Sequence, residues 1–478
     1  MRKISVSLCV FLTAVLCLPL IVTAGIRADN TMTAEQQVAA ISVGWNLGNT
    51  LDSYGTWIEN VTPESVETAW GNPVTTRQMI AAVRERGFNA IRIPVTWAQF
   101  TDSNGNVDGA WMARVRQVVD WSLDEGLYVI LNVHHDTGEH GQDKVCWMIA
   151  DMGTYNSVHD RYASLWTSIA EEFKDYDNRL MFEGYNELLD PNNTWNAPST
   201  GDDAYNAVNS YAQLFVDTVR ATGGNNATRN LIVNTYVASA DQAVLNAFVL
   251  PTDTVQDHLI CEVHAYIPWD FTSHLGNASY TAFDDNCRNQ IDGLMSNLSS
   301  FSARLGVPVI IGEFGVENQN NDADRASYIA YYVTRAAENG IKVFIWDNGL
   351  SDYGEYGVFD RNSLTWNETV VSALIDNAPS GSAVPAAEPA EETAAETIAE
   401  TSAETTAEVQ QTSSVQETVT TSANPVESGV NADDNSQSVN RNQNSFTILF
   451  IIGGVVVAAS YVGLFLLGRK IGKNKRER

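Results

Sequence analysis

LMFEGYNELLDP, residues 180–191, starts as a buried strand and ends in polar residues. Its first three residues are apolar, and Pro191 cannot continue a strand because proline has no backbone N–H. Between them lie Asn186 and Glu187. Polar groups that follow a rigid strand are typical of binding and catalytic sites, so we expect Glu187 to work with a second group elsewhere in the chain.

The same arrangement of a short apolar run and a longer amphipathic run repeats along the chain. The predicted strands are residues 43–49, 89–97, 128–135, 180–187, 230–237, 259–266, 307–315 and 342–349. The runs between them include TTRQMIAAVRERG, ARVRQVVDWSLDEG, SLWTSIAEEFKDY, YAQLFVDTVRATGG and DRASYIAYYVTRAAENG. Several end in Gly shortly before the next strand, as helices often do. Eight strand–helix units predict an α/β fold, a (β/α)8 TIM barrel, over residues 29–378.

A doubly wound open sheet is the alternative fold. That fold usually carries a Gly-rich phosphate loop after its first strand, and GNTLDSYG is a poor match to GxGxxG. A phosphate-handling barrel would carry Gly-rich loops after its last two strands, and none is found there. The pattern therefore favours a barrel with another chemistry.

Polar and aromatic residues gather near the carboxyl ends of the predicted strands, where barrel enzymes place their catalytic groups. They are Arg92, His134, His135, Asp136, Asn186, Glu187, His264, Tyr266, Glu313, Trp346, Asp347 and Asn348. Because all strand ends of a barrel meet at one mouth, we expect these residues to share a pocket.

Glu313 is the predicted partner of Glu187. Two carboxyl groups across a barrel mouth suit glycoside hydrolysis, in which one protonates the leaving oxygen and the other attacks the sugar or activates water. An attacking carboxylate needs hydrogen-bond donors, whereas a proton-donating carboxyl needs a raised pKa. The expected donors to Glu313 are Arg92, His264 and Tyr266, and Asn186 is expected to hold a sugar hydroxyl.

Two further glutamates, Glu183 and Glu262, lie within predicted strands. Glu183 comes four residues before Glu187, which places it about 13 Å deeper at the rise of a strand. A carboxylate buried there is better explained by an ion pair, with Arg92 as its partner, than by catalysis. The same interpretation applies to Glu262.

The segment HHDTGEH, residues 134–140, raises the alternative of a metal site. Adjacent strand residues point to opposite faces, and no HExxH motif is found, so we expect no catalytic metal. No GxSxG motif follows a strand, which argues against a serine nucleophile. Trp111 and Trp121 lie in a helical run and are expected in the core. The tryptophans in loops at the mouth could either stack on sugars or pack: Trp57, Trp147, Trp195 and Trp269.

Both ends of the chain differ in composition from the predicted barrel. Residues 1–28 combine basic residues, an apolar run and small residues, which predicts a secretory signal peptide, with an uncleaved anchor as the alternative. Residues 379–445 are rich in Ala, Glu, Thr and Ser, which predicts a disordered acidic linker. Residues 446–468 are apolar and precede a basic tail at 469–478, which predicts a transmembrane helix with the barrel outside the cell.

Charge and cysteine content exclude some classes of partner. The net charge of −30 argues against nucleic acid, whose phosphates need a basic surface. The mature chain would keep three cysteines, an odd number that predicts free thiols or at most one disulfide: Cys146, Cys261 and Cys287. The predicted barrel is expected to be monomeric.

The motifs GWNLGNTLD, TAWGNPVTT, GFNAIRIPVTW, VILNVHH, FEGYNEL, VHAY, IIGEFG and FIWDNG occur in an order that resembles glycoside hydrolase family 5. The first three most resemble its subfamily 4 endoglucanases. The resemblance covers residues 40–350 and implies a retaining endo-β-1,4-glucanase without metal or cofactor. It implies that Glu187 is the acid/base and Glu313 the nucleophile. The implied substrate-binding residues are Arg92, His134, His135, Asn186, His264, Tyr266 and Trp346.

Other activities remain open on this scaffold. The same site could belong to a xyloglucanase, a mixed-linkage glucanase or a xylanase, because the loops around the mouth decide between these substrates. A non-catalytic glycan-binding surface protein is the alternative from another class, and the complete pair of glutamates argues against it.

Overall fold

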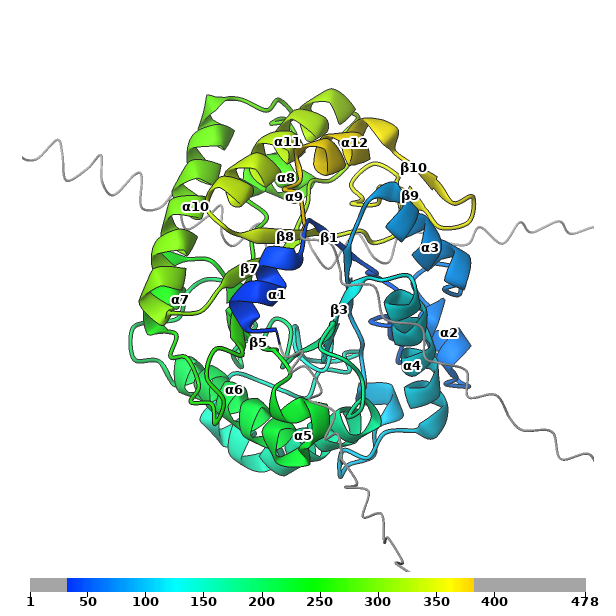
Figure 1. The fold of residues 1–478 in the computed structure, drawn as a ribbon, viewed down its shortest axis with the longest axis vertical. Helices are drawn as coiled ribbons and strands as arrows, with labels where there is room; N and C mark the ends of the chain where they lie inside the picture. Colours follow the sequence, from blue (N-terminus) through cyan, green and yellow to red (C-terminus); the bar gives the residue numbers. More distant parts are fainter. Residues whose placement is uncertain (1–31, 382–478) are drawn as a thin grey trace, which may run out of the picture. The chain divides into compact units, whose positions relative to one another are not determined.

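The computed structural model describes residues 32–381, and their eight parallel strands close into a barrel (Figure 1). The strands are β1 (Gly44–Asn46), β2 (Ala90–Ile93), β3 (Tyr128–Asn132), β4 (Leu180–Glu183), β5 (Leu231–Ser239), β6 (Leu259–His264), β7 (Val309–Phe314) and β8 (Lys342–Ile345). Each strand pairs with the next, and β8 pairs with β1. The predicted (β/α)8 barrel is confirmed.

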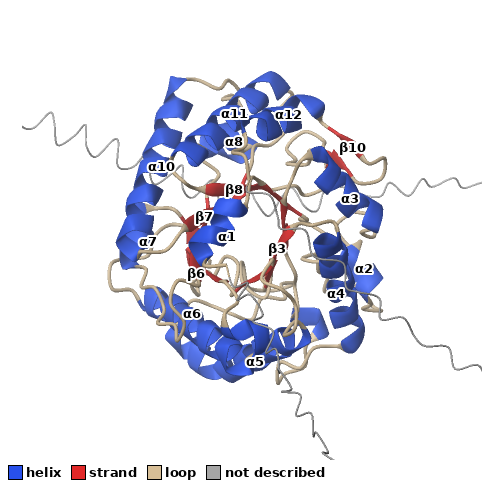
Figure 2. Ribbon diagram, viewed as in Figure 1, coloured by secondary structure: helices blue, strands red, loops and turns tan. Residues whose placement is uncertain are grey.

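Helices surround the strands as an outer ring (Figure 2). The long helices are α3 (Arg77–Arg86), α4 (Gly109–Asp124), α5 (Met152–Glu172), α6 (Asp203–Thr222), α10 (Asp285–Leu305), α11 (Asp322–Glu338) and α12 (Glu368–Asn377). The short elements are α1 (Ala34–Ala40), α2 (Pro63–Glu67), α7 (Gln242–Ala247), α8 (Trp269–Thr272), α9 (His274–Asn277), the 3-10 turns η1 (Ala98–Phe100) and η2 (Gly224–Ala227), and the hairpin strands β9 (Phe359–Asp360) and β10 (Thr365–Trp366). Gly87, Gly126 and Gly340 adopt positive φ just after α3, α4 and α11, as helix C-termini require.

The interior of the barrel begins with an apolar layer at the amino-terminal ends of the strands. Its members are Ala90, Tyr128, Ile130, Met181, Ile232, Ile260, Ile310 and Phe344. Gly44 completes the layer because a Cβ there would lie 1.9 Å from Cδ1 of Phe344. Val38 and Ile41, in and just after α1, pack on this layer, and α1 covers the centre of the barrel in Figure 1. The sequence patterns did not predict α1.

A polar layer follows the apolar one toward the carboxyl ends of the strands. Its members are Asn46, Arg92, Asn132, Glu183, Asn234 and Glu262. Each of them comes two residues after a member of the apolar layer on the same strand. Because side chains two residues apart in a strand point to the same face, these six also point into the barrel. All six are completely buried, and they form the floor of the mouth.

The observed strands are shorter than the predicted ones, and β4 shows why. It ends at Glu183, whereas the prediction extended it to Glu187. The carbonyl of Gly184 accepts hydrogen bonds from Tyr162 Oη (2.8 Å) and Trp166 Nε1 (3.0 Å) of α5 instead of from a strand. Glu187 therefore lies in the loop after β4.

The signal peptide, most of the linker, the transmembrane helix and the basic tail predicted from the sequence lie outside the described residues. Within residues 32–381, no helix combines the length and apolar character needed to cross a membrane. The three cysteines of this part are free thiols: Cys146, Cys261 and Cys287.

Candidate active site

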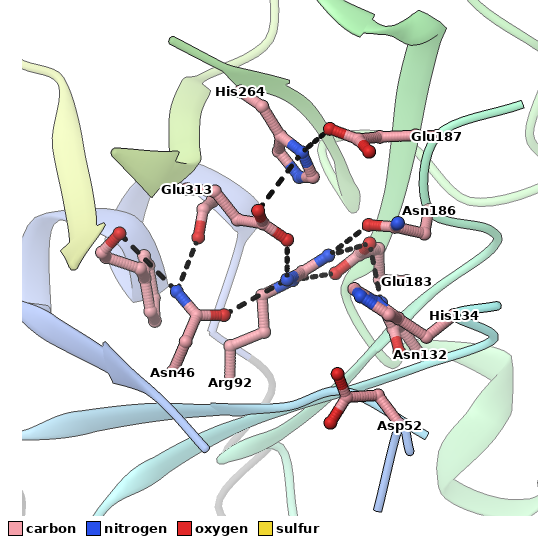
Figure 3. A network of polar contacts seen from close by, with 12 residues as sticks. Asn46, Asp52, Arg92, Asn132, His134, Glu183, Asn186, Glu187, His264 and Glu313 are labelled. Carbon is pink, nitrogen blue, oxygen red and sulfur yellow. Dashed lines mark hydrogen bonds and ion pairs between the residues drawn. The ribbon is translucent and has the colours of Figure 1, made fainter. Parts of the chain in front are cut away.

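Arg92 connects the floor of the mouth to its walls (Figure 3). Its Nε and Nη2 donate to the two carboxylate oxygens of Glu183, at 2.6 and 2.8 Å. Its Nη1 donates to Oε1 of Glu313 at 2.7 Å. The same guanidinium donates to Oδ1 of Asn46 and to Oδ1 of Asn186, at 3.0 Å each. One planar side chain thus fixes groups from three strands or the loops after them, and Glu183 has the partner that we expected.

The surroundings of Arg92 keep it charged despite its burial. Burial alone would lower the pKa of the guanidinium, because a low-dielectric interior disfavours charge. The negative charges of Glu183, Glu262 and Glu313 outweigh burial and raise the pKa of Arg92 well above its ordinary value. Arg92 is therefore a permanent cation next to Glu313.

Glu313 lies in β7 and receives hydrogen bonds on both carboxylate oxygens. Arg92 donates to Oε1, and Tyr266 Oη donates to Oε2 at 2.9 Å. Nδ1 of His264 lies 3.6 Å from Oε2. Arg92 and Tyr266 are two of the donors expected from the sequence, and the third, His264, lies near Glu313 as a charge without a hydrogen bond to it. Glu313 is only 5% exposed, so the interactions form with little competition from water.

Glu187 has a different environment from Glu313. Its side chain is 22% exposed, and Oε1 lies 2.8 Å from Nδ1 of His264. Burial raises the pKa of Glu187, while the hydrogen bond and charge of His264 oppose this rise. Burial alone would lower the pKa of the imidazole of His264. Three carboxylates outweigh burial and raise it to about 10: those of Glu313, Glu187 and Glu262.

The two glutamates face each other across the mouth. One carboxylate oxygen of Glu187 and one of Glu313 lie within 4.8 Å of each other, with a nitrogen of His264 equally near. Figure 3 shows His264 between the two carboxyl groups. Carboxyl groups about 5–5.5 Å apart allow one of them to attack the sugar directly, whereas about 6.5–9.5 Å leaves room for a water. Oxygens within 4.8 Å of each other are compatible with the shorter of these separations.

His134 is held as a neutral hydrogen-bond donor. Oδ1 of Asn132 accepts from the backbone N–H of Val95 at 3.0 Å, which leaves Nδ2 of Asn132 as the donor. This nitrogen lies 3.0 Å from Nδ1 of His134, so Nδ1 accepts and the ring proton sits on Nε2. Burial lowers the pKa of His134 well below its ordinary value, which keeps the ring neutral.

His134 and His135 lie side by side, with ring centroids 4.5 Å apart. The expectation that they point to opposite faces is wrong, because β3 ends at Asn132 and both histidines lie in the turn beyond it. Nε2 of His135 is 3.8 Å from Oδ2 of Asp52. Burial lowers the pKa of His135 to about 3 and raises that of Asp52 to about 7, so this contact is not a full ion pair at neutral pH.

Two groups of side chains bring potential metal ligands within 4.8 Å of one another: Asp52, His134 and His135; and Glu187, His264 and Glu313. In the first group, Nε2 of His134 carries a proton, and both oxygens of Asp52 accept backbone N–H groups, from Asn49 and Thr50. In the second group, a protonated His264 has no free lone pair. The donor chemistry of both groups therefore favours hydrogen bonding over metal ligation.

A family model described as cellulase, glycosyl hydrolase family 5, matches residues 51–352. The chain belongs to glycoside hydrolase family 5. The matched residues include Glu187, Glu313 and all other site residues predicted from the sequence. The predicted resemblance to this family is therefore confirmed.

Relatives of this family 5 hydrolase include named endoglucanases. Endoglucanase A of Ruminococcus albus is 38% identical over 358 residues, which cover 73% of this chain and 93% of that protein. A solved broad-specificity endoglucanase of subfamily 4 from Ruminococcus champanellensis, with bound cellotriose, is 41% identical with a TM-score of 0.67, covering 72% of this chain and 99% of that one. A family 5 enzyme from Prevotella bryantii B14, solved with a xyloglucan tetradecasaccharide, is 41% identical with a TM-score of 0.66, covering 73% and 99%. The chain is a glycoside hydrolase of the endoglucanase type.

Aromatic residues of this family 5 hydrolase divide into packed and exposed ones. Trp346 follows β8, is partly buried, and lies parallel to the ring of His134 with centroids 5.9 Å apart. Trp147 lies under the guanidinium of Arg161, 3.9 Å from its ring centroid, and therefore packs. The other three tryptophans expected in loops are about half exposed: Trp57, Trp195 and Trp269. Trp269 begins the short helix α8 and so does not lie in a loop. Trp111 is fully buried in the core and Trp121 partly buried against it, as predicted.

Sequence reasoning missed Asn46 and Asn132, which orient Arg92 and His134. Both asparagines stand in apolar strands, at the position where the interior layer turns polar. An amide side chain that is buried in an apolar strand must have a hydrogen-bond partner. This requirement was the signal that could have identified both asparagines. Which partner each amide takes depends on the closure of the barrel, so the sequence could not supply it.

Proposed function

We propose that this family 5 hydrolase cleaves internal β-1,4 bonds of β-glucans with retention, using Glu187 as acid/base and Glu313 as nucleophile. The contrast between the two carboxyl groups carries the proposal. Glu313 accepts hydrogen bonds from Arg92 and Tyr266, which stabilise the charged form that attacks. Burial raises the pKa of Glu187, which favours the protonated form that donates.

The reaction takes two steps. Glu313 attacks the anomeric carbon while the bond to the leaving oxygen breaks and Glu187 gives its proton to that oxygen. Water then enters, Glu187 removes its proton, and the oxygen of water replaces the carboxylate of Glu313 on the anomeric carbon. His264 contacts both glutamates and stabilises negative charge on each in turn. Each step uses side chains of this chain and water.

We propose that Trp346 lies against the sugar at the cleavage point, while Asn186 and His134 hold its hydroxyl groups. Oδ1 of Asn186 accepts from Arg92, so the amide N–H groups remain for a ligand. Nε2–H of His134 is a fixed donor for the reason given above. The indole of Trp346 supplies an apolar face of the kind that sugars stack on.

The roles of the two glutamates are tested with an aryl β-cellobioside that has a good leaving group. Glu187→Ala should still form the glycosyl-enzyme, because such a leaving group needs little protonation, and should stall at hydrolysis. Azide needs no deprotonation and should restore turnover to a β-glycosyl azide. Glu313→Ala should be inactive without azide. An α-anomer as the first product from the unmodified enzyme, or a β-azide from Glu313→Ala, would overturn the assignment.

Xyloglucan and mixed-linkage glucan are the second candidate substrates. The observation that favours them is the naming of relatives: the Prevotella bryantii enzyme was solved with a xyloglucan oligosaccharide, and a Caldicellulosiruptor relative is called a lichenase. Product analysis on carboxymethylcellulose, xyloglucan, mixed-linkage glucan and xylan decides the preference. We expect activity on the three glucans and little on xylan.

We also propose that the enzyme is exported and anchored to the outer face of the cell membrane, as a monomeric catalytic domain on an acidic linker. The support is the sequence of residues 1–28 and 379–478, with its apolar segment at 446–468 and basic tail. A chain that ends after Asn377 should be released into the medium with full activity. Retention of this shorter form by the cells would contradict the anchor, and light scattering of it tests the monomer.

A further inference from the structure

Arg361 is a buried cation behind the mouth that touches the two loops around Trp346. It follows β9 directly, and its side chain is 1% exposed. Its Nη1 donates to the carbonyl of Gly48, after β1, at 2.8 Å. Its Nη2 donates to the carbonyl of Asp347, after β8, at 2.6 Å. One guanidinium therefore bridges the loops that leave two neighbouring strands.

These loops confine the indole of Trp346. The N–H of Gly48 donates to the carbonyl of Asp347 at 3.1 Å, which joins the loops directly. A Cβ on Gly48 would lie 2.7 Å from Cζ2 of Trp346, so the backbone of this loop is in contact with the indole. The backbone N–H of Trp346 donates to the carbonyl of Phe314 at 2.8 Å, which fixes the backbone of Trp346 to the end of β7. A shift of the loop at Gly48 would therefore move the ring.

The contacts of Arg361 need the shape of a guanidinium. Nη1 also donates to Oγ1 of Thr50, whose hydroxyl in turn donates to the carbonyl of Gly48 at 3.0 Å. Nη2 lies 3.5 Å from Oδ1 of Asp347, and Oδ2 of Asp347 accepts from Nε1 of Trp45 at 3.0 Å. A planar fork reaches these acceptors in fixed directions, which the single ammonium of lysine cannot do.

We propose that Arg361 is a positioning residue for Trp346, acting by holding the loops after β1 and β8 together behind the indole. The inference rests on the proposed function, in which Trp346 lies against the sugar at the cleavage point. Arg361 is too deeply buried to touch substrate, because its side chain is 1% exposed. Loss of its fork would misplace the indole while the two glutamates stay in position.

A double-mutant cycle tests this inference, with kcat and KM measured on a soluble cello-oligosaccharide. Arg361→Lys alone should lower kcat/KM about 10- to 100-fold, as small displacements of a substrate-positioning group do. In the background of Trp346→Ala, the same substitution should cost less than about twofold, because the group that it positions is gone. Arg220→Lys is the matched control: Arg220 lies in α6, and its buried fork pairs at 2.7 Å with Asp253 in the segment before β6. This substitution should leave kcat/KM unchanged.

The outcomes separate the two proposals. If Arg361→Lys costs the same factor with and without Trp346, Arg361 does not act through the indole and the positioning inference is wrong, while the role of Trp346 stands. If Trp346→Ala keeps the activity of the unmodified enzyme, the proposed role of Trp346 is wrong and the inference falls with it.

Should Arg361→Lys fail to fold, Thr50→Val removes one acceptor of the fork. It should give a smaller loss that again disappears in the Trp346→Ala background, and an equal loss in both backgrounds would overturn the inference.

Discussion

Arg92 and Arg229 are both completely buried, but they lie toward opposite ends of the barrel and have opposite surroundings. Arg92 faces the mouth and ion-pairs with three carboxylates. Arg229 lies just before β5, at the amino-terminal end, and donates mainly to backbone carbonyls, among them those of Leu180 (2.7 Å) and Phe173 (2.9 Å). Among residues 32–381, no carboxylate lies within ion-pairing distance of Arg229.

The difference shows what each end of the barrel requires. Burial lowers the pKa of Arg229 to about 9, and the charge of Asp177 offsets only part of this effect. The pKa of Arg92 instead rises well above its ordinary value, because its carboxylates outweigh burial. At the closed end, an arginine joins chain segments through neutral acceptors and stabilises the fold. At the mouth, the arginine balances several negative charges. The reaction requires these charges, whereas the fold alone does not.

The largest expected effect comes from exchanging each arginine for methionine. Arg92→Met leaves buried carboxylates without their cation and should cost about 3–5 kcal/mol of stability. It also removes a donor from Glu313, so the enzyme that remains folded should lose about 10²–10³-fold in kcat. Arg229→Met should lower stability too, by about 1–3 kcal/mol for each carbonyl left unpaired. Urea unfolding and turnover per folded molecule measure the two effects separately.

Arg229→Met is the matched control for Arg92→Met, since both lose the same buried side chain. Its turnover per folded molecule should equal that of the unmodified enzyme. If the two variants lost turnover equally, the division between a stabilising end and a catalytic end would not hold. If Arg92→Met kept its turnover, the ion pair with Glu313 would have no part in the reaction.

The sequence predicted more of the mouth's residues than of their arrangement. Glu187 and Glu313 could be found because each follows or ends an apolar run, and the count of eight such runs predicted the barrel. The rotation of single groups depends on contacts between distant strands, which no local pattern contains. His134 and His135 illustrate this: strand alternation separated them, whereas the early end of β3 brings their rings together. The helix α1 was missed because its apolar face is short and has meaning only against the closed barrel.

A change in the apolar layer should have the next largest effect, and on stability alone. Met181 is completely buried at the closed end, so Met181→Ala should cost about 2–5 kcal/mol. Val249→Ala, at a residue that is 62% exposed, is the control and should change stability by less than about 0.5 kcal/mol. Both variants should keep the turnover of the unmodified enzyme per folded molecule. A loss of turnover by folded Met181→Ala would show that the apolar layer also shapes the mouth.

The smallest expected effect is a change in how stability depends on pH, caused by Glu262 in the polar layer. Burial and the charge of Glu183 raise the pKa of Glu262 from 4.5 to about 7 in the folded chain. A carboxyl whose folded pKa is raised binds its proton more tightly when folded. Its contribution to stability is therefore complete below the unfolded pKa and is lost as pH rises through about 7. The melting temperature of the unmodified enzyme should therefore fall more between about pH 5 and pH 8 than that of Glu262→Gln, whose side chain stays neutral throughout.

Met181→Ala is the control. It removes no titrating group, so its melting temperature should change with pH as that of the unmodified enzyme does. Parallel curves for the unmodified enzyme and Glu262→Gln would mean that folding does not raise the pKa of Glu262 and that its carboxylate stays ionised beside Arg92 over this pH range.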